Sequence, residues 1–88
     1  MEWLPYTQRD LIYGEYGDDL QCVDERSAPY KRERCETFVF RHVPTGRYVE
    51  INYMSHYDHG VYPETAEWFE VVPRVEHITI TKYVPVED

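Results

Sequence analysis

The chain has few of the residues that build metal sites, disulfides or phosphate-binding loops. It has two cysteines, Cys22 and Cys35, which lie thirteen positions apart instead of forming a close-spaced pair. Its four glycines are scattered, so no glycine-rich loop is present to cradle a phosphate. No run approaches the ~20 apolar residues that span a bilayer, and the first ten residues lack a basic-then-apolar signal pattern. We therefore expect a cytoplasmic protein with free thiols, no cofactor and no membrane segment.

Positive charge is also scarce, with nine Lys and Arg against seventeen Asp and Glu and a net charge of −8. A negative field repels phosphate backbones, so the net charge argues against direct nucleic-acid binding. The same field attracts basic surfaces, including those that other proteins use to hold DNA or RNA. The simpler alternative is that the charge only keeps a small protein soluble.

Aromatic residues, in contrast, are plentiful. Of the 88 residues, 42% are hydrophobic and 16% aromatic, with nine tyrosines, which differs from the composition of disordered chains. The length corresponds to a single domain, residues 1–88. A chain of this size buries only roughly 60–65% of its unfolded surface, so we expect a folded domain with a thin core.

Residues 36–84 have the pattern of antiparallel strands. Four segments are rich in β-branched and aromatic residues and predict strands, namely 36–43, 47–54, 67–72 and 77–84. Pro73 is expected to stop the third of them, because proline cannot donate a ladder hydrogen bond.

The first two strands flank "PTG", which predicts a hairpin with a three-residue loop and Gly46 in the left-handed position. That loop pairs Val43 with Arg47 and places Val39 opposite Ile51. Both faces of the sheet then carry apolar residues, so both need cover. A slip by one residue would instead place Phe40 opposite Val49 and Phe38 opposite Ile51.

The first 35 residues have a mixed pattern. Thr7 followed by Asp10 predicts a capped helix through Tyr13 that ends at Gly14. Residues 19–24 predict a strand, and residues 27–35 predict a helical turn capped by Ser27. We therefore predict an α+β, mainly β fold, a small antiparallel sheet of four to five strands with at most short helices. Residues 1–35 are expected to pack on this sheet.

Residues 55–70, "SHYDHGVYPETAEWFE", contain a predicted recognition loop that leads into the strand predicted at 67–72, and they have two competing interpretations. His56 and His59 with Asp58 between them offer metal-binding or acid–base groups. Their spacing matches no zinc site and no catalytic pattern, so we expect neither a metal site nor catalytic residues. The alternative is that they are polar loop residues without a chemical role.

The second interpretation is a protein-binding surface, because tyrosine and tryptophan are enriched at interfaces. Acids alternate with these aromatic residues, and an acidic rim around aromatic anchors suits a basic groove on a partner. Carboxylates could also mimic the phosphates of DNA. Alternatively, Trp68 belongs to the core and the tyrosines shield a sheet edge. The predicted partner contacts are Tyr57, Asp58, Tyr62, Glu64, Glu67 and Glu70.

The order "NYMSHYDHGVYP" and then "EWFEVVPRVEHITITKYVPV" resembles the carboxy-terminal part of small acidic bacteriophage-encoded proteins, over about residues 52–86. The resemblance is to proteins of the host-defence-inhibitor (anti-CRISPR-like) or early-protein kind. It implies a protein that binds and disables a host nuclease, CRISPR effector or other nucleic-acid-handling enzyme in the host cytoplasm.

The function predicted from the sequence is therefore a non-catalytic protein-binding module, a monomer or homodimer that acts on a host protein with a basic surface. A second possibility is a small virion or assembly protein that acts by self-association. A third is a metal-binding enzyme or sensor.

Overall fold

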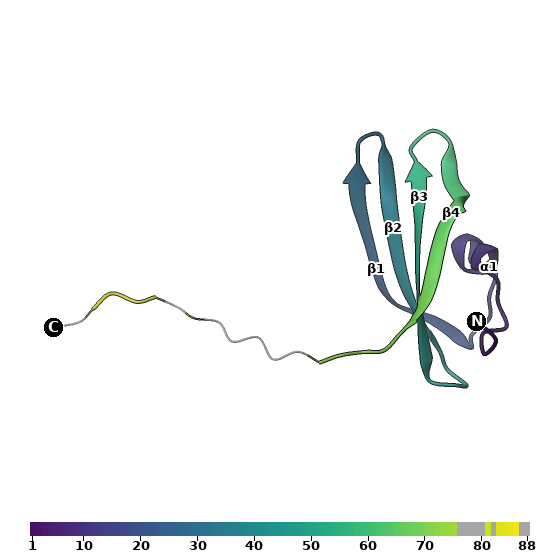
Figure 1. Cartoon of the computed structure of the whole chain (residues 1–88), viewed down its shortest axis with the longest axis horizontal. Helices are drawn as coiled ribbons and strands as arrows, with labels where there is room; N and C mark the ends of the chain where they lie inside the picture. The colour runs from purple at the N-terminus through teal and green to yellow at the C-terminus, as the bar shows by residue number, and fades with distance from the viewer. Residues whose placement is uncertain (76–80, 82, 87–88) are drawn as a thin grey trace.

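The computed structural model describes residues 1–75, 81 and 83–86, which form an open four-stranded antiparallel sheet with one short helix (Figure 1). The elements are α1 (Gln8–Tyr13), β1 (Leu20–Tyr30), β2 (Glu33–His42), β3 (Arg47–His56) and β4 (Gly60–Val71). The strands lie in the order β1-β2-β3-β4, so each strand pairs with its neighbour in the chain. The predicted mainly β fold is confirmed. No helix in the described part of the chain has the length and apolar character needed to cross a membrane.

The helix α1 begins and ends where its sequence predicts. The Thr7 hydroxyl accepts a hydrogen bond from the Asp10 backbone N–H, and the Asp10 carboxylate accepts one from the Thr7 N–H. Gly14 ends the helix with a φ of 72°, a left-handed conformation that glycine adopts at low cost. Six residues are too few for an independently stable helix, so α1 depends on burial of Leu11 against the sheet.

The β2–β3 register decides which side chains are buried. Phe40 lies opposite Val49 and Phe38 opposite Ile51. The register with Val43 opposite Arg47 is therefore wrong, and the alternative register, slipped by one residue, is confirmed. The Gly46 N–H bonds to the His42 carbonyl at 2.8 Å, with Gly46 at a φ of 69° as expected. This register gathers the large apolar side chains of both strands on one face, where a single layer covers them.

The amino-terminal strand extends further than predicted. The strand expected at residues 19–24 is present, but it continues to Tyr30. The helical turn expected at residues 27–35 is wrong, because this segment ends β1, turns at Lys31 and Arg32, and begins β2. Pairing along the whole length of β2 outweighs the weak local preference of this polar segment.

Residues 67–71 of the predicted third strand form the end of β4, which begins earlier than expected, at Gly60, and ends at Val71, two residues before Pro73. Most of the fourth predicted strand, residues 77–84, lies outside the described residues.

The core lies between one face of the sheet and the amino-terminal segment. Its buried residues are Leu4, Leu11, Leu20, Phe40, Val49, Ile51 and Tyr53. Trp3 lies 5.9 Å from the His42 ring, and the Arg47 guanidinium lies 4.9 Å above the Trp3 ring. The Tyr6 hydroxyl donates to the Asp19 carboxylate, which fixes the segment before α1 to the start of β1.

Tyr53 makes the stability of this core depend on pH. Burial, and secondarily the nearby Glu36 carboxylate, raises the pKa of Tyr53 to about 12. The unfolded tyrosine ionises near 10, so the stabilisation is complete below pH ~10 and is lost as the pH rises towards 12. From pH ~9.5 to ~11.5 we expect the free energy of unfolding to fall by about 1–2 kcal/mol more in the natural protein than in Tyr53→Phe. Urea titrations at both pH values measure the difference, and parallel losses in the two proteins would contradict it.

Candidate protein-binding surface

The sheet has one covered face and one open face. Directly opposed residues of antiparallel strands point to the same side, so the Phe40–Val49 pair marks the covered face and the Val39–Glu50 pair marks the other. The amino-terminal segment and α1 pack on the covered face. Among the described residues, no helix or second sheet lies over the other side, which we call the open face (Figure 1). The large apolar side chains that β2, β3 and β4 direct to the open face are Val39, Tyr48, Met54, Tyr62, Phe69 and Val71.

The open face is too apolar to be an ordinary solvated surface. The Phe69 side chain points away from the core, and 46% of its surface is exposed to solvent. Tyr48 and Val71 lie opposite one another on β3 and β4, and Met54 lies opposite Tyr62 in the same way. Contiguous apolar patches on a folded domain typically mark interaction sites.

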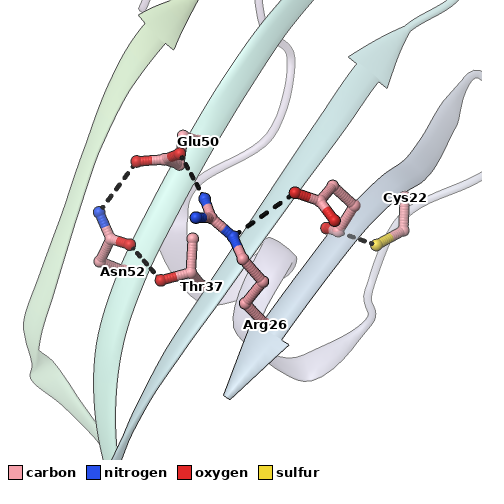
Figure 2. A network of polar contacts seen from close by, with 6 residues as sticks. Cys22, Arg26, Thr37, Glu50 and Asn52 are labelled. Atoms are coloured by element: carbon pink, nitrogen blue, oxygen red, sulfur yellow. Dashed lines mark hydrogen bonds and ion pairs between the residues drawn. The ribbon is translucent and has the colours of Figure 1, made fainter. Parts of the chain in front are cut away.

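A belt of polar side chains crosses the middle of the open face (Figure 2). Arg26 on β1 reaches across β2 to Glu50 on β3, with an Nη2–Oε1 distance of 3.4 Å, and its Nε lies 3.5 Å from Asp24. Asn52 donates to Glu50 at 3.4 Å and accepts from the Thr37 hydroxyl at 2.6 Å. The belt gives each of these polar groups a partner, and it divides the apolar side chains into two patches.

A β-bulge shapes one of the two patches. The β1–β2 register shifts between Cys22 and Asp24, so Val23 is left unpaired and 49% exposed. Beside it lies a shallow pocket whose lining residues are Val23, Asp24, Val39, Tyr48, Glu50, Val71, Val72 and Pro73. Its lining is mostly apolar with two carboxylates, a combination that suits an apolar anchor next to a basic group on a partner.

The six predicted contact residues are not brought together on one surface. Tyr62 and Glu67 lie on the open face, opposite Met54 and Asn52. Glu64 is exposed on β4, and Tyr57 and Asp58 occupy the β3–β4 turn. The loop expected before the predicted third strand is much shorter than predicted, because residues 55 and 56 end β3, residues 57–59 turn, and β4 already begins at Gly60.

Glu70 lies on the covered face, where it is engaged by an arginine. Its Oε2 accepts a hydrogen bond from Arg47 Nη2 at 2.7 Å, and this bond lowers the pKa of the Glu70 carboxyl. Side chains alternate along a strand, so Glu67 and Glu70, three positions apart, point to opposite faces. The predicted row of acids on β4 therefore does not form a continuous patch.

Tyr57 also has a partner within the chain. Its hydroxyl accepts a hydrogen bond from Arg34 Nε at 3.2 Å, and the guanidinium lies 5.0 Å from the centre of its ring. Tyr57 remains 65% exposed, so its other surfaces are available for contact.

The two cysteines are free. Cys22 is paired with Phe40 on the covered side, whereas Cys35 is paired with Met54 on the open face, so the sheet separates their side chains. Burial is the main cause that raises the pKa of the Cys22 thiol. The rings of His56 and His59 lie 4.6 Å apart, but the described residues contain no group of three or more metal-binding side chains.

Sequence reasoning missed the residues that form the centre of the open face. Arg26, Glu50 and Phe69 belong to three different strands, and only the pairing of those strands brings them to one surface. The available signal was the alternative hairpin register, which directs Val39 away from the core. The chain matches no protein-family model, and no curated protein or solved structure is significantly similar to it.

Proposed function

We propose that the chain is a non-catalytic protein-binding module that docks a partner protein on the open face of its sheet. The observation that carries the proposal is the set of apolar side chains on this face that the described part of the chain leaves without cover. A single sheet with one solvated face usually alternates apolar and polar residues cleanly. Here Val39, Tyr48, Phe69 and Val71 stand where polar residues are expected.

The charge of the module favours a basic partner. The net charge is −8, and Glu67 contributes a carboxylate to the open face, together with Asp24 and Glu50, whose two charges are only partly offset by Arg26. An acidic surface accelerates association with a basic one and disfavours acidic competitors. A host enzyme that handles nucleic acid has such a basic surface, so we propose an inhibitor of this class of protein as the specific role.

The proposal is tested by affinity capture. The immobilised chain is exposed to bacterial lysate at about 0.15 M salt and again at about 0.5 M salt, where the Debye length is roughly halved. We expect one dominant basic protein that is retained at the lower salt and depleted at the higher. An empty result with correctly folded bait would contradict the proposal.

Self-association is the second candidate, and the exposed edges of the sheet favour it. β1 and β4 are both edge strands, and all of β1 after Leu20 is exposed. Unpaired edges pair readily with a second chain. Sedimentation at several concentrations distinguishes the candidates, because an assembly unit forms a defined larger species without any partner.

A further inference from the structure

Positive charge gathers at one end of the sheet, away from the centre of the open face. The β1–β2 turn and the β3–β4 turn both lie at this end, because both hairpins reverse direction there (Figure 1). We call residues 30–34 and 56–59 the hairpin end. It contains Lys31, Arg32 and Arg34, three of the nine Lys and Arg of the chain. It also contains His56 and His59, and a shallow pocket lies between Tyr30, Lys31, Arg32, Glu33 and His56.

The cations of the hairpin end form no direct ion pair with a carboxylate of the described residues. Elsewhere in the described part of the chain, Arg26 and Arg47 form ion pairs with acids. Lys31, Arg32 and Arg34 form none among the described residues, although acids outnumber bases nearly two to one. Lys31 and Arg34 lie instead over the rings of Tyr30 and Tyr57, at 5.7 and 5.0 Å. Both tyrosines are at least 60% exposed.

The backbone conformation of Lys31 is unfavourable for a lysine. Tyr30 pairs with Glu33, so Lys31 and Arg32 form a two-residue hairpin turn. The φ of Lys31 is 57°, and it is the one non-glycine residue with a positive φ in the described part of the chain. Glycine or asparagine is preferred in such turns, because a Cβ atom is strained in the left-handed region. A strained residue that carries a charge at an exposed turn points to a role for that charge.

The net charge of the protein does not determine the potential at the hairpin end. Asp18 and Asp19 precede β1, whereas Lys31 follows it, so the length of the strand, about 35 Å, separates them. The Debye length at physiological salt is about 8 Å, so these acids are screened from the turn. The nearest acids are Glu33 and Asp58 within the hairpin end and Glu36, which lies two residues beyond Arg34 on β2 and interacts electrostatically with it. Glu36 is also held by hydrogen bonds from the Ser27 and Ser55 hydroxyls.

We propose that the hairpin end binds single-stranded nucleic acid, with Lys31, Arg32 and Arg34 neutralising phosphates and the exposed rings of Tyr30 and Tyr57 stacking on bases. Cations interleaved with aromatic rings are the usual elements of sites for single strands. This proposal goes beyond the protein-binding function. The net charge argued against direct nucleic-acid binding, and the proposal instead assigns such binding to one end of the sheet. It uses residues outside the polar belt and the apolar patches of the open face.

The test is fluorescence anisotropy of a labelled oligothymidylate of about ten nucleotides, titrated with the full chain. We expect binding at about 50 mM salt that weakens steeply by about 200 mM. Lys31→Gly removes one phosphate contact and relieves the strained turn, so its fold is retained. We expect it to bind roughly three- to tenfold more weakly and to reduce the salt slope by about one. Arg32→Ser is expected to weaken binding similarly.

Arg9→Ala is the matched control, because it removes one exposed cation from α1, below both turns (Figure 1). It is expected to bind like the natural protein. The proposal is overturned if the natural protein does not bind, or if Arg9→Ala and Lys31→Gly weaken binding equally. It is also overturned if polyglutamate of equal charge competes as well as the oligonucleotide, which would indicate an acidic protein partner. Competition by inorganic phosphate at the same phosphate concentration would indicate a simple anion site instead.

Discussion

Replacing Phe40 with alanine is expected to lower the free energy of unfolding by about 3–5 kcal/mol, whereas Phe69→Ala should change it by less than about 1 kcal/mol. Phe40 is 2% exposed, lies opposite Val49, and contacts the Tyr16 ring edge-to-face at 5.3 Å. Its truncation leaves a cavity between the sheet and the amino-terminal segment. Phe69 is 46% exposed on the open face, so its truncation leaves no enclosed cavity.

The expected loss at Phe40 is large compared with the whole stability of the domain. At about 0.05–0.15 kcal/mol per residue, a chain of this length has roughly 4–13 kcal/mol in total. Urea unfolding followed by far-UV circular dichroism measures both variants. Ile51→Val, at a residue with 0% exposure, is a graded reference with an expected loss of about 0.5–1.5 kcal/mol. Equal losses at Phe40 and Phe69 would mean that the assignment of covered and open faces is wrong.

The double substitution Tyr48→Ser and Phe69→Ser is expected to weaken partner binding roughly 100-fold or more, since buried aromatic anchors are each worth about 2 kcal/mol or more at interfaces. Both side chains lie on the open face, in neighbouring cross-strand pairs: Tyr48 on β3 is opposite Val71, and Phe69 on β4 is opposite Glu50. The fold should persist, because both point away from the core. The change therefore acts on binding and leaves the free energy of unfolding nearly unaltered.

Biolayer interferometry against the protein recovered by affinity capture measures this effect. Tyr13→Ser is the matched control, because Tyr13 is 47% exposed, close to the value for Phe69, but belongs to α1. It should retain the affinity of the natural protein. Unchanged binding by the Tyr48 and Phe69 double variant would exclude the open face as the docking surface. A loss confined to Tyr13→Ser would place the partner on the helix side.

Residues that act through short-range contacts or through their own backbone conformation were predictable from the sequence. Thr7, Asp10 and Gly14 determine where α1 begins and ends through short-range hydrogen bonds and one left-handed residue. Gly46 determines the position of a turn for the same reason. Runs of β-branched and aromatic residues located the strands, because these side chains fit a pleated surface whichever strand lies beside them.

The tertiary structure decided everything that depends on which strands pair and in which register. A slip by one residue exchanges the two faces of a strand, and only the burial of Phe38, Phe40, Val49 and Ile51 under the amino-terminal segment selects between the registers. The same pairing separated Glu67 from Glu70, created the turn at Lys31 and assembled the open face. Local sequence determined α1, the turn at Gly46 and most of the strands, whereas pairing with β2 extended β1 to Tyr30. Long-range burial of apolar surface determined the two faces of the sheet, because that free energy is gained only when distant residues meet.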